Sequence, residues 1–195
     1  MSFEIKLLQE EELKIAAGLS RYVFDYCLRN RMEFQQTVAF VEEYITEENL
    51  VKLYLENKLV LWGVFEENQM VAVAGLQSEG MITMLYVLPA YQNKGYGSHL
   101  LKTVREYAKH TLNLERVTLN ATPAWTSAYF KKRGFSFFRS DRNLKVPFIP
   151  MYAMSNEIAS YEKRRVPWQV VFFVVVGSLL IATTAGVLFM ISYLF

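Results

Sequence analysis

A glycine-spaced turn between an apolar run and a helical pattern carries the clearest chemical potential in this chain. Gly95 and Gly97 follow the apolar run 81–88 and Pro89, and helical spacing of apolar residues begins directly after them. Glycine lacks a Cβ atom, so backbone N–H groups at these positions can approach a ligand closely. The first turn of a helix adds unpaired N–H donors and the positive end of the helix dipole. The residues therefore predict an anion site suited to a phosphate or pyrophosphate group.

The identity of that anion follows from the motif around the glycines. The dinucleotide fingerprint GxGxxG needs a third glycine where the chain has Leu100, and the Walker loop GxxxxGK[ST] is absent. What is present is Q-x-x-G-x-G over 92–97, after a strand pattern that ends in Y-V-x-P. Together with VTLNATPAW and YFKKRGF further along, the stretch TMLYVLPAYQNKGYGSHLL resembles the GNAT acyltransferase superfamily. The coenzyme A loop of that superfamily is written [RQ]-x-x-G-x-[GA].

The resemblance implies a binding mode for acetyl-CoA that uses mainly backbone groups. It implies that the pyrophosphate is held by a turn made of Gln92, Asn93, Lys94, Gly95, Tyr96, Gly97 and Ser98. It also implies that the pantetheine arm lies between the splayed fourth and fifth strands, where it meets main-chain groups of Leu85, Tyr86 and Val87. One N–H of these three would polarise the thioester carbonyl, as an oxyanion hole does. Asn120, at the end of the fifth strand, would bond the pantetheine or cap the following helix.

The general base is less clear from the resemblance. Direct acyl transfer needs a group that removes a proton from the amine. The family often places a glutamate on the fourth strand, but the aligned position here is Met81. Glu79 lies two residues earlier and would share that face if the strand begins so soon. Asp25 and Glu33, near the junction of the first two helices, are weaker alternatives, and a chain of water molecules is another.

The general acid that returns a proton to the thiolate is commonly a tyrosine in the family motif [FY]-Y-x-x-x-G-F. Counting back from Gly134 places Phe130 there, which cannot donate a proton. Counting forward from Asn120 places Tyr129 there instead. Adjacent helical residues point about 100° apart, so only one of the two can face the thiol. We expect it to be Tyr129. We expect the basic run 131–133 to be a solvated helix face that can also meet anionic lipid headgroups.

The expected order of elements is β-α-α-β-β-β-α-β-α-β-β over residues 3–154. Alternating patterns predict strands over 3–8, 59–65, 70–77, 81–88, 116–121, 135–139 and 145–154. Helical spacing predicts helices over 10–30, 34–45 with a short extension over 50–56, 97–112 and from Thr122 to Gly134. In the last of these, Thr122 is the expected N-cap and Pro123 the first helical residue. The expected fold class is α+β, a three-layer GNAT fold. Its mixed, mostly antiparallel sheet has 6–7 strands with a parallel, splayed fourth and fifth strand, and one C-terminal transmembrane helix follows.

Composition narrows the classes of function. The 21 Lys and Arg residues nearly balance 19 Asp and Glu residues, which does not indicate a nucleic-acid partner. The single cysteine, Cys27, excludes an internal disulfide framework. The pattern contains no spacing typical of metal ligands, so no metal cofactor is expected. A homodimer stays open.

The C-terminal end has a different composition from the rest. After Arg165 there is no charged residue, and 166–195 is long enough to cross a bilayer, which takes about 20 apolar residues. The basic residues 163–165 precede it, so the positive-inside rule places the domain 1–154 in the cytoplasm. We therefore expect a GNAT domain over 1–154, a basic linker over 155–165 and a single-pass anchor in the cell membrane.

These patterns favour an acetyl-CoA-dependent N-acetyltransferase that transfers acetyl directly to an amine acceptor at a membrane. The acceptor can be a small molecule, a peptide, or a protein N-terminus or lysine. The alternative is a catalytically inactive GNAT-fold module that binds acyl-CoA as a sensor or scaffold. The absent glutamate at Met81 keeps this alternative open. A third option is an oligomer built by the anchor whose soluble domain binds no nucleotide.

Overall fold

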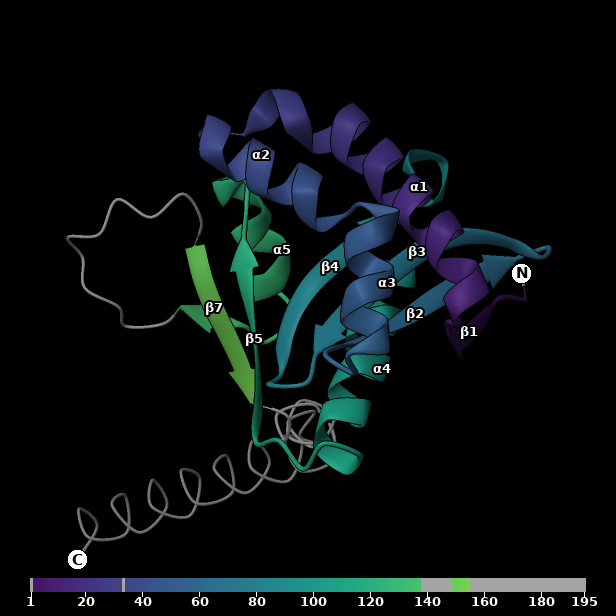
Figure 1. Cartoon of the computed structure of the whole chain (residues 1–195). Helices are drawn as coiled ribbons and strands as arrows, with labels where there is room; N and C mark the ends of the chain where they lie inside the picture. Colours follow the sequence, from purple (N-terminus) through teal and green to yellow (C-terminus); the bar gives the residue numbers. More distant parts are fainter. Residues whose placement is uncertain (1, 33, 138–148, 155–195) are drawn as a thin grey trace, which may run out of the picture. The chain divides into compact units, whose positions relative to one another are not determined.

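A mixed sheet organises the part of the chain that the computed structural model describes, which is residues 2–32, 34–137 and 149–154. The strand order is β1-β2-β3-β4-β5-β7-β6 (Figure 1). The strands are β1 (Glu4–Leu7), β2 (Leu59–Glu66), β3 (Gln69–Gln77), β4 (Met81–Val87), β5 (Arg116–Ala121), β6 (Ser136–Phe137) and β7 (Ile149–Met154). Neighbouring strands are antiparallel except β4 and β5, which are parallel. This confirms the predicted mixed sheet with a parallel fourth and fifth strand.

The helices cover both faces of this sheet. They are α1 (Leu13–Val23), α2 (Gln35–Tyr44), α3 (Glu47–Leu55), α4 (Tyr96–His110) and α5 (Ser127–Lys131). The prediction of one continuous helix over 10–30 was wrong in detail. A 3₁₀ turn precedes α1, a π-helical turn (Phe24–Leu28) follows it, and a further 3₁₀ turn (Arg29–Arg31) ends the segment. Short 3₁₀ turns also span Pro89–Tyr91 and Ala124–Thr126.

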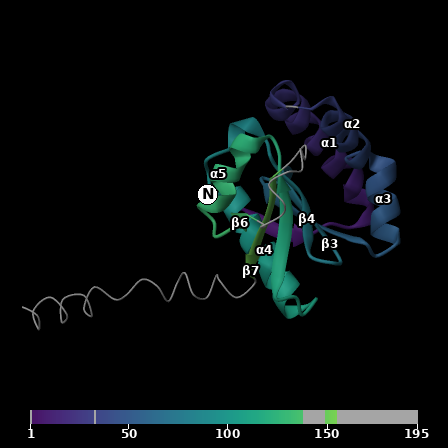
Figure 2. The same ribbon diagram turned by 90° about the vertical axis from the view of Figure 1, so that its left-hand side faces the viewer.

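Two apolar cores lie on opposite faces of the sheet. Against one face, α4 buries Leu100, Leu101 and Val104. Against the other, α1 buries Leu13, Ala16 and Val23 at helical spacing, and α3 adds Leu50. Figure 2 shows α1, α2 and α3 on one side of the strands and α5 on the other. Because both faces of β3 are covered, all its residues from 70 to 76 are buried.

Local signals in the sequence explain several element boundaries. The hairpin between β2 and β3 turns at Glu67 and Asn68, both with positive φ (50° and 64°), as the tight type I′ turn of a hairpin requires. Helix α3 begins after Thr46, whose side chain accepts a hydrogen bond from the Asn49 backbone N–H. Gly134 follows α5 with a φ of 82°, which confirms its predicted role in ending that helix.

Two predictions near the C-terminus of the domain need correction. Thr122 is not a helix N-cap. The 3₁₀ turn that follows it is preceded by Pro123, α5 begins only at Ser127, and the Thr122 hydroxyl instead contacts the Met32 sulfur at 3.5 Å. The predicted last strand is observed from Ile149, and 145–148 lie outside the described residues.

The predicted linker over 155–165 and the predicted anchor over 166–195 also lie outside the described residues. Among the helices of the described part, none is both long and apolar enough to cross a bilayer.

Candidate active site

The parallel strands β4 and β5 separate after a short stretch of pairing. They are in register only at Met81 with Thr118 and Ile82 with Leu119. The register between β3 and β4 shifts in the same place. Met84 pairs with Gly75, and Ile82 pairs with Leu76, so one residue of β4 between them has no partner on β3. Thr83 is thus an extra residue, a β-bulge, and bulges bend and twist the strand that carries them. The bulge accounts for the divergence of β4 from β5 that the family resemblance implies.

Beyond the bulge, alternate residues of β4 turn their backbone groups toward β5. The Leu88 N–H donates to the Val71 carbonyl of β3 at 2.9 Å. Hydrogen-bonded residues alternate along an antiparallel pair, so Tyr86 faces β3 as well, whereas Leu85 and Val87 present their N–H and C=O groups on the other side. This geometry favours the predicted pantetheine contacts for Leu85 and Val87. It does not favour a main-chain contact for Tyr86, whose side chain is also buried against α1.

The glycine-spaced turn has the backbone shape that the sequence predicts. Gly95 precedes the first residue of α4 and has a φ of 93°, in the left-handed region that glycine tolerates best. Asn93 also has a positive φ of 63°, a conformation that asparagine adopts more readily than most residues. The turn therefore leads abruptly from the end of β4 into the N-terminus of α4.

The first turn of α4 leaves backbone donors open. The N–H groups of Ser98 and His99 both donate to the Gly95 carbonyl, at 2.9 and 3.1 Å. The N–H groups of Tyr96 and Gly97 have no acceptor among the described residues, as expected of the first residues of a helix. Two open donors at the positive end of a 15-residue helix can bind an anion.

Tyr129 lies against this same first turn. A Cβ atom added at Gly97 would be 2.5 Å from the Tyr129 hydroxyl oxygen and 3.7 Å from a methyl group of Val87. A glycine is thus needed at position 97 because the Tyr129 hydroxyl approaches it closely, and not because of its φ angle. The neighbouring Phe130 turns its ring to Phe135 in the core, with ring centroids 5.6 Å apart. Of the two aromatic candidates, the structure therefore turns Tyr129 toward the glycine turn.

A cation completes this corner, and the sequence analysis missed it. The Arg133 guanidinium lies 3.4 Å from the centre of the Tyr129 ring. Its Nε donates to Ser98 Oγ at 2.9 Å, and its Nη1 donates to the Tyr129 carbonyl at 3.0 Å. The prediction had treated Arg133 as part of a solvated basic run. Its position four residues after Tyr129, in the turn that ends α5, is the signal in the sequence that could have identified it.

The Tyr129 hydroxyl is held in its neutral form. Burial raises the pKa of Tyr129, and this effect outweighs the opposing influences of the Arg133 charge and a hydrogen bond with the Ser98 side chain. A hydroxyl that keeps its proton at neutral pH can donate it to a more basic group.

Two further side chains of the predicted turn are held by contacts within the domain. The Tyr96 hydroxyl donates a short hydrogen bond to the Glu66 carboxylate, and this bond raises the pKa of Tyr96 to about 12. The Lys94 ammonium lies 4.5 Å from the centre of the Tyr91 ring. The first contact fixes the turn against β2, and the second fixes it against the 3₁₀ turn before it. The Tyr96 and Gly97 N–H groups are left without an acceptor among the described residues.

Gln92, the first residue of the motif, joins the turn to the end of β4. Its amide nitrogen donates to the Val87 carbonyl at 3.0 Å and lies 3.6 Å from the sulfur of Cys27. The side chain thus holds the edge of β4 in position rather than pointing into the turn. Cys27 has no thiol partner among the residues described and lies half-buried in the π-helical turn after α1.

The structure gives Glu79 no support as a general base. Glu79 lies in the exposed turn between β3 and β4, hydrogen-bonded to Ser78, and β4 begins only at Met81. The condition for its role, that the strand reaches residue 79, is not met. The turn is also at the opposite end of β4 from the glycine turn.

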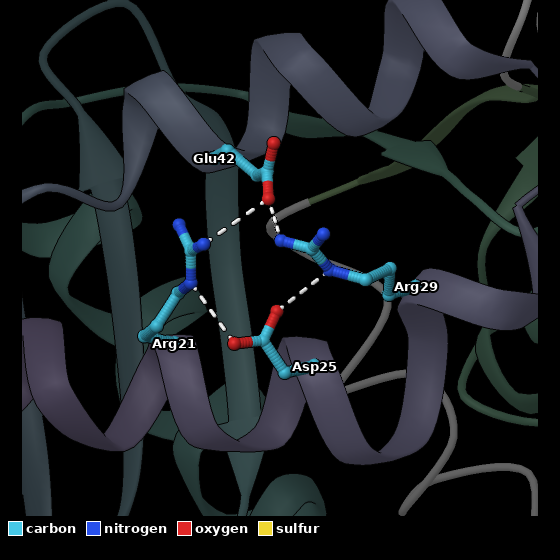
Figure 3. A network of polar contacts seen from close by, with 4 residues as sticks. All are labelled: Arg21, Asp25, Arg29 and Glu42. Carbon is cyan, nitrogen blue, oxygen red and sulfur yellow. Dashed lines mark hydrogen bonds and ion pairs between the residues drawn. The ribbon is translucent and has the colours of Figure 1, made fainter.

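The other candidates for acid–base or binding roles are placed as follows. Asp25 accepts hydrogen bonds from Arg21 and Arg29 (Figure 3); burial opposes their effect, but the two bonds prevail and lower the pKa of Asp25. A carboxylate held on both oxygens in this way is a poor base. Glu33 lies outside the described residues. Asn120 does not cap a helix, and in β5 it faces away from the buried Leu119.

No group of three or more potential metal-ligating side chains occurs in the part of the chain that is described.

Comparison with known proteins identifies the family of this chain. Residues 28–157 match the family model described as "Acetyltransferase (GNAT) domain". A search of curated proteins found no significant match.

Solved structures share the fold at low sequence identity. The PaiA N-acetyltransferase of Thermoplasma acidophilum, in complex with coenzyme A, has a TM-score of 0.65 and 18% identity over 79% of this chain and 99% of its own. A GCN5-related N-acetyltransferase of Rhodopseudomonas palustris has a TM-score of 0.64 and 18% identity over 79% and 96%. The spermidine/spermine N-acetyltransferase SpeG of Vibrio cholerae has a TM-score of 0.57 and 16% sequence identity, over 82% of this chain and 98% of its own.

Proposed function

Because the chain belongs to the GNAT family of N-acetyltransferases, we propose that it transfers the acetyl group of acetyl-CoA directly to an amine acceptor at a membrane surface. One observation carries the proposal. The open N–H donors of Tyr96 and Gly97 follow directly on the backbone edge that Leu85 and Val87 present away from β3. On this edge the Val87 carbonyl accepts from the Gln92 amide, and no strand pairs with β4 beyond Ile82 among the described residues. An anion site next to a strand edge with no partner strand suits a ligand with a diphosphate and an amide-containing arm.

The residues of this chain fit coenzyme A in two places. The diphosphate would meet the first turn of α4, where the Arg133 guanidinium donates to Ser98 Oγ and adds a positive charge. The pantetheine amides would meet Leu85 and Val87, much as an added strand does. When bound, acetyl-CoA supplies a thioester carbonyl, and the Leu85 N–H, which points away from β3, would polarise it.

Tyr129 is the proposed general acid. Its hydroxyl keeps its proton and lies close to Gly97, beside the Val87 end of β4. During transfer the amine nitrogen forms a bond to the carbonyl carbon, the carbon–sulfur bond breaks, and Tyr129 gives its proton to the departing sulfur. The amine's own proton leaves to water, because the family's glutamate position holds Met81.

The binding part of the proposal is tested by calorimetry with coenzyme A on the full chain in detergent. Arg133→Ala should weaken coenzyme A binding about tenfold or more, since a hydrogen bond from a charged group contributes ~1.5–3 kcal/mol. Lys132→Ala is the matched control, because Lys132 is exposed and should leave the affinity unchanged. Equal affinities for both variants, or no heat with the unaltered chain, would refute the site.

Turnover separates the enzyme from the inactive alternative. Thiol release from acetyl-CoA with a panel of amines should be measurable for the full chain and fall ~100-fold or more in Tyr129→Phe, the scale on which a general acid acts. Coenzyme A binding without turnover, unchanged by this substitution, would favour a sensor or scaffold. Met81 at the base position is the observation that keeps that second function in view.

The proposed membrane location depends on the sequence of 166–195. Its uncharged, apolar composition after the basic residues 163–165 supports a single span with the acetyltransferase domain in the cytoplasm. The full chain should stay with membranes during alkaline carbonate extraction, whereas a chain that ends at 165 should be released. Release of both would exclude the anchor.

A further inference from the structure

The bulge residue of β4 points to the class of amine that this enzyme accepts. Ile82 packs in the core on the α4 side, whereas Met84 and Tyr86 pack in the core on the α1 side. Between them, the Thr83 side chain bonds to Tyr44 of α2, so Thr83 and Met84 point to the same face. The Thr83 hydroxyl therefore lies on the face of β4 that α1 covers, next to the point where the pairing of β4 with β5 ends.

The Thr83 hydroxyl is held by a polar but uncharged group. The Tyr44 hydroxyl donates to Thr83 Oγ1 at 2.9 Å and accepts from the Gln77 amide at 3.3 Å. The backbone carbonyl of Tyr44 accepts from the Asn49 side chain at 2.8 Å, which fixes the end of α2 on α3. Burial and, to a lesser extent, the negative charge of Glu79 raise the pKa of Tyr44, so its hydroxyl stays neutral.

Thr83 keeps hydrogen-bonding capacity for a ligand. A hydroxyl offers one donor and two lone pairs, and only one lone pair of Thr83 has a partner among the described residues. The remaining lone pair can accept an N–H of an amine. Thr83 is two residues from Leu85, about 7 Å along a strand, so an amine on Thr83 is near the carbonyl that Leu85 polarises.

The carboxylates between α1 and α2 are neutralised. Asp25 and Glu42 each bind both Arg21 and Arg29, which gives a ring of two negative and two positive charges (Figure 3). A polyamine carries several ammonium groups, and each needs a free acceptor or carboxylate. This ring offers none.

The side chain that lies next to Tyr44 is aromatic. The Phe40 ring stacks on the Tyr44 ring, with centroids 6.1 Å apart, and 65% of Phe40 is exposed. An exposed aromatic face beside an uncharged hydrogen-bonding group suits an apolar body attached to one ammonium group.

We propose that the acceptor is a monoamine with an aromatic or apolar body, whose nitrogen binds the Thr83 hydroxyl and whose body packs on Phe40. Tyr44 acts as a positioning residue that orients Thr83. This inference rests on the proposed function and names its substrate class.

The probes are 2-phenylethylamine and spermidine, compared on the full chain in detergent with acetyl-CoA. The value of kcat/KM for 2-phenylethylamine should be at least about tenfold higher, which corresponds to ~1.4 kcal/mol of preference. Binding of each amine to the complex with coenzyme A, measured by calorimetry, gives the same comparison without turnover. The inference would be overturned if spermidine had a kcat/KM or a binding affinity equal to or higher than that of 2-phenylethylamine.

Variants test the residues themselves. Thr83→Val and Tyr44→Phe should raise the KM or Kd for 2-phenylethylamine about five- to tenfold, the effect of one hydrogen bond, and leave coenzyme A affinity unchanged. Thr83→Ser should restore the KM, because it keeps the hydroxyl. Tyr22→Phe is the matched control, since Tyr22 is exposed on α1 and stacks on Tyr26. Unchanged amine affinity in both Thr83→Val and Tyr44→Phe would overturn the assignment.

A double substitution tests the charge ring. Replacing both Arg21 and Arg29 by alanine frees Asp25 and Glu42 and should improve the use of spermidine severalfold, with little change for 2-phenylethylamine. An unchanged ratio of the two amines would contradict the role given to the ring. Loss of coenzyme A binding by the unaltered chain would instead refute the proposed function, so the two failures are distinguishable.

Discussion

Adding one methyl group at Gly97 tests how the glycine turn and Tyr129 fit together. The new Cβ atom of Gly97→Ala would be 2.5 Å from the Tyr129 hydroxyl oxygen, whereas favourable contacts begin near 3.5 Å. The Tyr129 ring cannot retreat freely, because the Arg133 guanidinium lies 3.4 Å from its centre. Either α4 or Tyr129 must therefore move.

The expected cost follows from this overlap. Overpacking of a well-filled site typically costs about 1–3 kcal/mol. For a protein of this size each kcal/mol lowers the melting temperature by about 2–4 °C. Displacement of the hydroxyl should also lower kcat more than coenzyme A affinity, because Tyr129 is the proposed acid. Thermal unfolding of the full chain in detergent and thiol release measure the two effects.

A double-mutant cycle separates the clash from general damage. Tyr129→Phe removes the oxygen atom that the new methyl group would meet, and the nearest remaining ring atom is 3.6 Å away. In this background Gly97→Ala should be nearly neutral in stability, which gives a coupling of about 1 kcal/mol or more. Gly18→Ala is the control: nothing lies within 4 Å of its Cβ, and it should be neutral or stabilising by up to ~1 kcal/mol. Additive effects of Gly97→Ala and Tyr129→Phe would refute the placement of Tyr129.

Three further substitutions test the frame of the site. Thr46→Ala should destabilise the fold by ~1 kcal/mol in urea unfolding, because the N-cap bond to the Asn49 N–H is lost, and Thr46→Ser should recover most of it. Phe24→Ala should cost about 3–5 kcal/mol, since Phe24 is fully buried, and a loss below 1 kcal/mol would contradict its burial. The lowered pKa of Asp25 means that its ionised form stabilises the fold above pH ~4, and that this contribution is lost as the pH falls through the folded-state pKa. Arg29→Ala should therefore reduce stability by under ~1 kcal/mol at pH 7 and by progressively less as the pH falls below ~4, and a loss that does not change with pH would exclude the ion pair.

Local patterns in the sequence were sufficient to predict most of the elements in order and the glycine turn. Alternating and helical periodicities are local patterns, and they predicted β2, β3, β4, β5 and α4 to within a few residues. Gly95 was identifiable because only a residue without Cβ adopts its left-handed conformation easily. The same local reasoning failed at Thr122 and Pro123, where a capping pattern was present but the helix begins later.

Which side chains contact one another could not be predicted from the sequence and is seen only in the folded structure. The bulge at Thr83, its bond to Tyr44 and the closed ring of Arg21 and Arg29 with two carboxylates join residues up to 39 positions apart in the chain. No local pattern specifies such contacts, because they depend on how the helices pack on the sheet. The same holds for Arg133, whose reach to Ser98 follows from the docking of α5 beside the N-terminus of α4. Local patterns thus predicted the backbone of the glycine turn, and packing determines which side chains lie around it.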